Sequence, residues 1–208
     1  DTINKTTSTG HYAEIFKETD SMYITKRALV ASYQKNDSIY IHSDTILMTG
    51  NEKNRIIRAF KNAKIFKSDL SGKADSIHFN RKNGLAKLIN INGQLNSPFI
   101  KTKKPILWTQ SNQITGDSIH LLFNIDNDNI DSLLVFNNAL IINKDSIGPG
   151  YNQISGQKLY GNFIDNELRK IDIVKNAESI YYLRNSDNEL VGIDRSKSGR
   201  IKILLDNN

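Results

Sequence analysis

Apolar and polar residues alternate in short runs along most of the chain, and this two-residue period is typical of β-strands with one buried face. The clearest runs place Ile, Leu, Val, Tyr or Phe at every second position, at residues 38–41, 76–79, 118–123, 132–136, 169–174 and 201–205. Residues that tolerate the backbone of tight turns separate the runs, as at Asn83-Gly84 and Asp165-Asn166. The pattern predicts an all-β protein.

Two sequence markers recur within these runs. An Asn-Ala pair beside apolar residues occurs at Asn62-Ala63, Asn138-Ala139 and Asn176-Ala177, so that the asparagines are 76 and 38 residues apart. A hydroxyl residue followed by glycine alternates with this pair, at Ser71-Gly72, Thr115-Gly116, Ser155-Gly156 and Ser198-Gly199. A period of 38 to 40 residues built from strands indicates an elongated, stacked β architecture.

The markers also predict the shape of the strands. The segments between turns run for about 12 to 18 residues, more than twice the usual strand length of about 5 to 6. Each marker lies near the middle of a segment, and small residues are accepted where a strand turns a corner. We therefore expect long antiparallel strands that bend at the markers and form two facing sheets. An ordinary β-sandwich of short strands, with the Asn-Ala pairs a coincidence, is the alternative.

The alternation assigns one set of apolar residues to the space between the sheets. In a closed sandwich this set is core, whereas in an open V it lines a trough for acyl chains, in which each buried CH₂ contributes about 0.8 kcal/mol. As candidate lipid-binding residues we name Ile77, Phe79, Ile119, Leu121, Leu133, Val135, Leu159, Ile171, Ile173, Ile201 and Ile203.

Candidate catalytic and metal-binding residues are outweighed by structural interpretations. His78 and His120 occupy the same repeat position, each three residues after an aspartate, and these are ligand types for zinc. The alternation, however, directs both histidines to the solvated outer face. Asp-Ser and Asp-Thr pairs recur too regularly for the two singular carboxylates of a glycoside hydrolase, and structural roles are favoured. Nucleotide-binding and nucleophile motifs are absent from the sequence, so we expect no enzyme and no cofactor.

Composition adds charge to this picture. The 208 residues include 28 Lys and Arg against 22 Asp and Glu, a net charge of +6, and 38% hydrophobic residues but no cysteine, which excludes disulfides and thiolate metal sites. Basic residues concentrate at 101–104 and at Arg55, Arg58, Lys61, Lys64 and Lys67. Stacking aromatics do not accompany them, which argues against nucleic acid. Anionic lipid headgroups and simple solubility are the other interpretations.

Several longer motifs carry a family resemblance. They are Pro105-Ile106-Leu107-Trp108, residues 112–121 (NQITGDSIHL), residues 150–161 (GYNQISGQKLYG) and Val174-Lys175-Asn176-Ala177 followed by Ile180-Tyr181-Tyr182. Together they resemble the OstA-like proteins of Bacteroidota-type bacteria, relatives of LptA and of the periplasmic domain of LptD. The resemblance covers residues 22–207. It implies a β-jellyroll or "β-taco" fold, an interior that carries lipid A acyl chains, and end-to-end stacking of modules.

The resemblance also predicts organisation, partners and location. We expect an N-terminal extension or partial strand at residues 1–21 and one OstA-like β-jellyroll domain at residues 22–208. The expected partners are lipopolysaccharide, through lipid A, other Lpt-type transport components, and a second copy paired through edge strands. The expected location is the periplasm, with outer-membrane association. The start at Asp1, without Met or an apolar leader, suggests a matured or trimmed product.

Two other classes of function stay open at this point. A structural β-repeat spacer or scaffold of the cell envelope would share the stacked strands but would pack its interior without a ligand. A carbohydrate-binding or carbohydrate-cleaving β-protein would need aromatic residues or paired carboxylates on one exposed face, for which Asp75 and Asp117 would be the first candidates.

Overall fold

The computed structural model describes residues 6–33, 38–51, 54–90, 104–109, 111–127, 129–145 and 147–205. The described helical elements are two 3-10 turns, η1 (Lys17–Thr19) and η3 (Arg81–Asn83), and Asn54 also has a 3-10 conformation. No described helix is long and apolar enough to cross a membrane. The strands are β1 (Thr6–Thr9), β2 (Tyr12–Phe16), β3 (Ser21–Tyr33), β4 (Ser38–Thr49), β5 (Ile56–Lys67), β6 (Leu70–Asn80), β7 (Leu85–Ile89), β8 (Ile106–Thr109), β9 (Asn112–Thr115), β10 (Ser118–Phe123), β11 (Ile130–Lys144), β12 (Tyr151–Ile164), β13 (Glu167–Arg184) and β14 (Leu190–Leu204).

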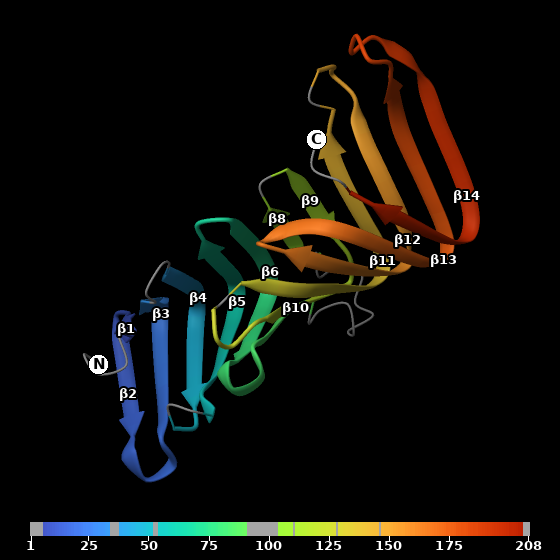
Figure 1. The fold of residues 1–208 in the computed structure, drawn as a ribbon. Helices are drawn as coiled ribbons and strands as arrows, with labels where there is room; N and C mark the ends of the chain where they lie inside the picture. Colours follow the sequence, from blue (N-terminus) through green and yellow to red (C-terminus); the bar gives the residue numbers. More distant parts are fainter. Residues whose placement is uncertain are drawn as a thin grey trace, which may run out of the picture.

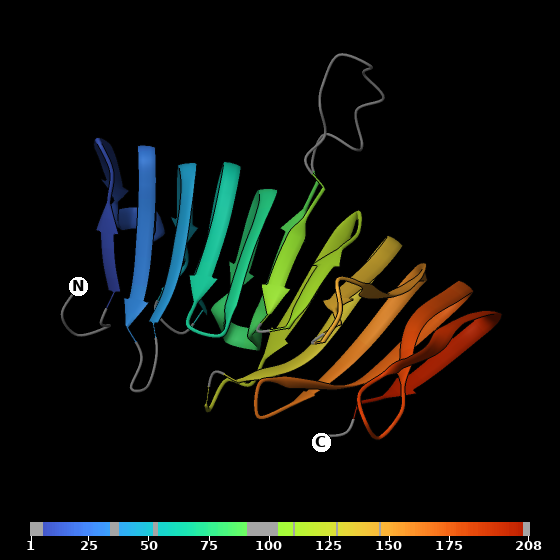
Figure 2. The same cartoon turned by 90° about the horizontal axis from the view of Figure 1, so that it is seen from above.

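All of these strands belong to one antiparallel sheet that is folded back on itself. β6 pairs with β7 through residues 76–80 and with β8 through residues 70–73. β11 pairs with β10 through its first half and with β9 through its second half. The sheet therefore has two facing arms, the β7 arm, which includes β2 and β10, and the β8 arm, which includes β1 and β9. Figure 1 shows the V between the arms, and Figure 2 shows the stack from β1 to β14.

The line of corners between the arms explains the Asn-Ala marker. At each corner, one strand has two consecutive residues with positive φ, at Lys26-Arg27, Lys61-Asn62, Asn137-Asn138 and Lys175-Asn176. Each pair coincides with a shift in strand register, so these are β-bulges that turn the strand. The alanine that follows each pair is at most 2% exposed, because it points into the apex of the V. The predicted elongated stack of long bent strands is confirmed.

The hydroxyl-Gly marker has two roles, of which only one was predicted. Gly116, Gly156 and Gly199 lie at the corners, opposite the bulged residues of the neighbouring strand. Gly72 does not, because the corner of β6 falls at Asp75 and Gly72 pairs with Ile65 in the β8 arm. A Cβ atom on Gly72 would come within 3.0–3.2 Å of Leu88, Ile65 and Leu107. Gly72 is therefore small to admit packing between the arms, and its assignment to a bend was wrong.

Two of the recurrent aspartates brace these corners. The Asn138 amide donates to both carboxylate oxygens of Asp117, with Nδ2–Oδ distances of 3.0 and 3.2 Å, and Asn62 donates to Asp44 at 3.1 Å. Each bond joins a bulged strand to the corner of the strand before it. Asp44 and Asp117 therefore have a structural role at the corners.

Replacing Asn138 with alanine should therefore destabilise the fold by about 1 kcal/mol more than replacing Asn137. Both variants place alanine at a positive φ, but only Asn138 also loses its bonds to a carboxylate. Urea unfolding of the two variants measures the difference. Equal free energies of unfolding would show that the Asn138–Asp117 bonds contribute nothing to the corner.

Candidate functional site

The predicted lipid-binding residues all lie on the inner face of the sheet. Eight of them are at most 1% exposed, and Phe79, Ile201 and Ile203 are partly buried against the same cluster. Strand register arranges the set into two rows that run along the stack. One row reads Ile77, Leu88, Ile119, Val135, Leu159, Ile173 and Ile201, and the other reads Phe79, Ala86, Leu121, Leu133, Gly161, Ile171 and Ile203. Their contact with a lipid stays a prediction.

All eleven predicted residues belong to the β7 arm, and the wall that faces them was not predicted. The β8 arm presents its own buried row, Val30, Ile41, Ile65, Leu107, Ile114, Ile141 and Ile154, interrupted by Gly72. The same two-residue alternation marks several of these positions, including Ile41 in the run at residues 38–41. Following each run past its corner would have identified the second wall.

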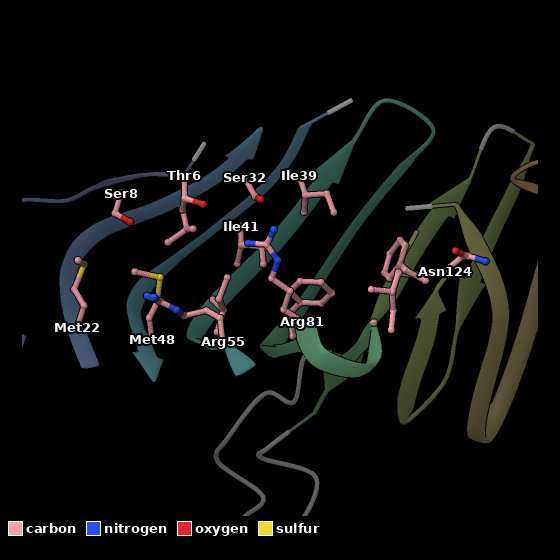
Figure 3. Close-up of a pocket in the computed structure, with 16 residues that line it drawn as sticks. Thr6, Ser8, Met22, Ser32, Ile39, Ile41, Met48, Arg55, Arg81 and Asn124 are labelled. Atoms are coloured by element: carbon pink, nitrogen blue, oxygen red, sulfur yellow. The ribbon is translucent and has the colours of Figure 1, made fainter. Parts of the chain in front are cut away.

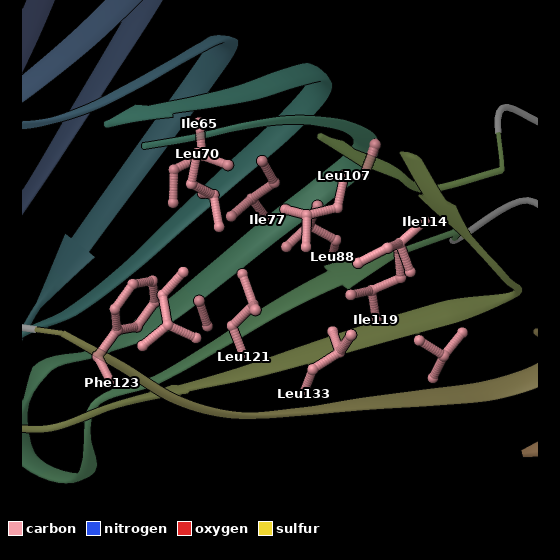
Figure 4. Packing of buried hydrophobic residues seen from close by; sticks show 14 of the residues in the cluster. Ile65, Leu70, Ile77, Leu88, Leu107, Ile114, Ile119, Leu121, Phe123 and Leu133 are labelled. Carbon is pink, nitrogen blue, oxygen red and sulfur yellow. The ribbon is translucent and has the colours of Figure 1, made fainter. Parts of the chain in front are cut away.

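The middle of the interior is filled. Ile77, Leu88, Leu107, Ile114, Ile119, Leu121 and Leu133 are all 0% exposed and interdigitate between the two arms, as Figure 4 shows. Side chains packed in this way leave few voids larger than a water molecule. In this region the inner faces of the arms form a core, and open volume occurs on either side of it along the stack.

One cavity lies toward the β1 end of the stack and has a volume of about 430 Å³. Its walls come from both arms and combine polar with apolar side chains, the apolar ones including Ile39 and Ile41 on the β8 arm and Met48, Ile57 and Phe79 on the β7 arm. Figure 3 shows these walls together with two arginines of the lining, Arg55 and Arg81. Of the eleven predicted residues, only Phe79 lines this cavity. The cavity combines apolar side chains with cationic groups, and this combination suits an anionic amphiphile.

A second cavity of about 360 Å³ lies toward the β14 end. Ile141, Ile154, Ile171 and Leu205 form its apolar part, and burial raises the pKa of Tyr181, which also lines it. The rest of the lining consists of Leu168, Thr109, Ser111, four asparagines, Glu167 and Arg169. Arg169 is already paired with Glu167, at 2.6 Å, so this cavity has a more neutral polar rim than the first.

The histidines lie on the outer face, as the alternation predicts, but they do not form a shared site. β7 separates their strands, and Lys87 lies opposite His78 on one side and His120 on the other. Each ring packs edge-on against a phenylalanine, Phe60 or Phe136. Burial, together with the nearby Lys87, lowers the pKa of both histidines. They are half-buried rather than fully solvated, and no set of three or more metal-ligand residues occurs among the described residues.

Comparison with known proteins yields a structural similarity only. No family model and no curated protein matches the sequence. Among solved structures, the chain is similar to LptH from Pseudomonas aeruginosa, the LptA homologous periplasmic component of the lipopolysaccharide transport device. The identity is 9% and the TM-score is 0.47, over 71% of this chain and 92% of that one. A similarity at this level does not assign a function.

Proposed function

We propose that this protein is a non-enzymatic periplasmic module that shelters the acyl chains of lipopolysaccharide in its apolar interior on the way to the outer membrane. The observation that carries the proposal is the pair of facing apolar walls, with a cavity of about 430 Å³ between them. That volume falls in the range of about 300–1,000 Å³ that is usual for small-molecule sites. The family resemblance of the sequence motifs points to the same ligand.

Binding in such a site is driven by removal of acyl chains from water. Each CH₂ that exchanges water for the side chains of the two walls contributes about 0.8 kcal/mol. The cavity accommodates part of a lipid that has several acyl chains, so deeper entry requires the arms to separate around the packed middle. Residues that bind nucleotide are not recognisable in the chain, and the direction of transport would come from a partner that hydrolyses it.

The ends of the stack suit association with other modules. Within the described residues, β14 pairs only with β13, and β1 and β2 pair only with β3, so each end of the described sheet presents an edge strand. Such edges accept a strand from a neighbour by β-augmentation. We propose other Lpt-type components, or a second copy of this chain, as the partners there.

A photo-crosslinker at Phe79 tests the proposal. Replacing Phe79 with p-benzoylphenylalanine keeps an aromatic ring in the cavity, next to Phe123. Phe66 provides the matched control, since it is 56% exposed on the outer face of β5. After irradiation with purified lipopolysaccharide, we expect strong labelling at position 79 and background labelling at position 66. Equal labelling at both positions, or none at position 79, would overturn the proposal.

A structural spacer is the second candidate, and the filled middle of the interior favours it. A spacer needs the stacked strands and the edges but no ligand, and a core of fully buried side chains is what it would have. Native mass spectrometry of protein purified gently from cells separates the two candidates. A carrier retains a bound amphiphile, whereas a spacer has the mass of the chain alone.

A further inference from the structure

Two arginines meet at the first cavity although 25 residues separate them in the sequence. The Arg81 backbone N–H donates to the Arg55 carbonyl at 3.0 Å, which fixes the two residues side by side. Arg81 begins the η3 turn, which is capped by the Asn80 side chain and ended by Gly84 in the left-handed conformation. Both side chains line the cavity, and Figure 3 shows them directed toward its apolar walls.

Arg55 and Arg81 differ from the four arginines that form ion pairs. Arg169, Arg184, Arg195 and Arg200 each form an ion pair with an aspartate or glutamate. Within the described part of the chain, neither Arg55 nor Arg81 has a carboxylate within ion-pair distance. These two guanidinium groups give the cavity a positive local potential, which attracts an anion. Their planar donor groups match phosphate oxygens in a bidentate geometry.

We propose that Arg55 and Arg81 bind the phosphate of an anionic amphiphile whose alkyl chain occupies the cavity. The inference rests on the proposed function and adds the headgroup chemistry and the position of the head. The phosphate lies at the arginines, beside the ends of β5 and β6, and the alkyl chain lies against the adjacent apolar row Met22, Met48, Ile57 and Phe79. Unbranched methionine side chains adapt to chains of different shape, which suits a wall that accepts a lipid.

Isothermal titration with defined single-chain probes below their critical micelle concentrations tests this assignment. Dodecyl phosphate and dodecyl maltoside share a chain but differ in charge. We expect the wild-type protein to bind dodecyl phosphate about tenfold or more tightly than dodecyl maltoside. The double variant Arg55→Gln/Arg81→Gln should lose that preference and keep its affinity for the maltoside, which also shows that the cavity is intact.

Arg58→Gln is the matched control. Arg58 lies on the same strand as the cavity residue Ile57 but points outward, where it donates to Thr49 Oγ1 at 3.1 Å, so its loss should leave the preference unchanged. Equal affinity of the wild type for the two probes, or an equal loss in Arg58→Gln, would overturn the assignment. Inorganic phosphate that displaces dodecyl phosphate at equal concentration would also overturn it, since the arginines would then bind free phosphate.

The outcome is separable from that of the proposed function. The Arg55→Gln/Arg81→Gln variant, carrying the photo-crosslinker at Phe79, should still label with lipopolysaccharide if the interior shelters acyl chains. If the protein with arginines at both positions labels with lipopolysaccharide but binds the two dodecyl probes equally, the arginine site alone is rejected. A phosphate preference without lipopolysaccharide labelling rejects the lipopolysaccharide proposal and keeps the site for a smaller amphiphile.

Discussion

Replacing Gly84 with alanine is expected to destabilise the protein by about 2–4 kcal/mol and to abolish the preference of the first cavity for a phosphate headgroup. Gly84 has a φ of +63°, and a Cβ atom there would lie 2.2 Å from the Phe123 carbonyl oxygen. The left-handed backbone costs an alanine about 1–2 kcal/mol, and relief of the clash costs about as much again. The Gly84 carbonyl accepts a hydrogen bond from the Phe123 N–H at 2.9 Å, so the clash also separates η3 from the end of β10. Because Arg81 begins η3, its side chain then loses its fixed position at the cavity.

Gly199→Ala is the control for this variant. Gly199 lies in the exposed strand β14, where an added Cβ meets nothing within 4 Å, so its replacement should change the free energy of unfolding by about 0.5 kcal/mol or less. Urea unfolding of both variants gives the two free energies, and titration with dodecyl phosphate gives the effect on Arg81. Equal stability of Gly84→Ala and Gly199→Ala would show that η3 moves freely and does not fix Arg81.

The corners illustrate what local sequence determines. Asparagine tolerates the left-handed backbone of a bulge and alanine fits the narrow apex, so three of the corners were visible as Asn-Ala pairs. The corner at Lys26-Arg27 has the same positive φ values and the same buried alanine, Ala28, but no asparagine. There the pairing with β4 on both sides of the bulge imposes the conformation, and no local signal reports it.

The arginine site illustrates what local sequence cannot determine. The basic concentration around Arg55 was visible, but the fold separates its members. Arg58 points outward to Thr49, Lys61 lies in a corner, and Lys67 is 5% exposed and paired with Asp69. Arg55 lies next to Arg81 because β5 pairs with β6 and η3, which follows β6, is hydrogen-bonded to the start of β5. Proximity of this kind depends on register, which the sequence motifs did not specify.

The packing angle between the arms was also beyond the sequence. Alternation identified the inward positions of the β7 arm correctly, but it is identical for a filled core and an open trough. The outcome depends on which side chains meet across the V, such as Leu107 beside Leu88 and Ile114 beside Ile119, and these pairs come from different arms. The filled middle and the two cavities are therefore findings of the structure.

Leu133→Ala should destabilise the protein by about 2–5 kcal/mol, a large part of the about 5–15 kcal/mol that is usual for a folded protein. Leu133 is 0% exposed and lies between Leu121 and Gly161 in the packed middle, so truncation leaves a cavity that the two arms cannot easily close. The adjacent Leu134 points to the outer face beside His120 and Tyr160, and Leu134→Ala should cost about 1 kcal/mol or less. Thermal or urea unfolding of the two variants gives the comparison.

The same pair of variants distinguishes a packed middle from a permanently open trough. In an open trough Leu133 would contact water or lipid, and its truncation would weaken lipid binding while costing little more stability than Leu134→Ala. In the structure the side chain holds the arms together, so the expected loss is mainly one of stability.

Separation of the arms becomes easier in the truncated variant, because fewer apolar contacts must be broken for a chain to enter. Leu133→Ala should therefore label more extensively than the wild type when lipopolysaccharide is crosslinked through Phe79, at temperatures where the variant stays folded. Reduced labelling together with unchanged stability would indicate the open trough instead.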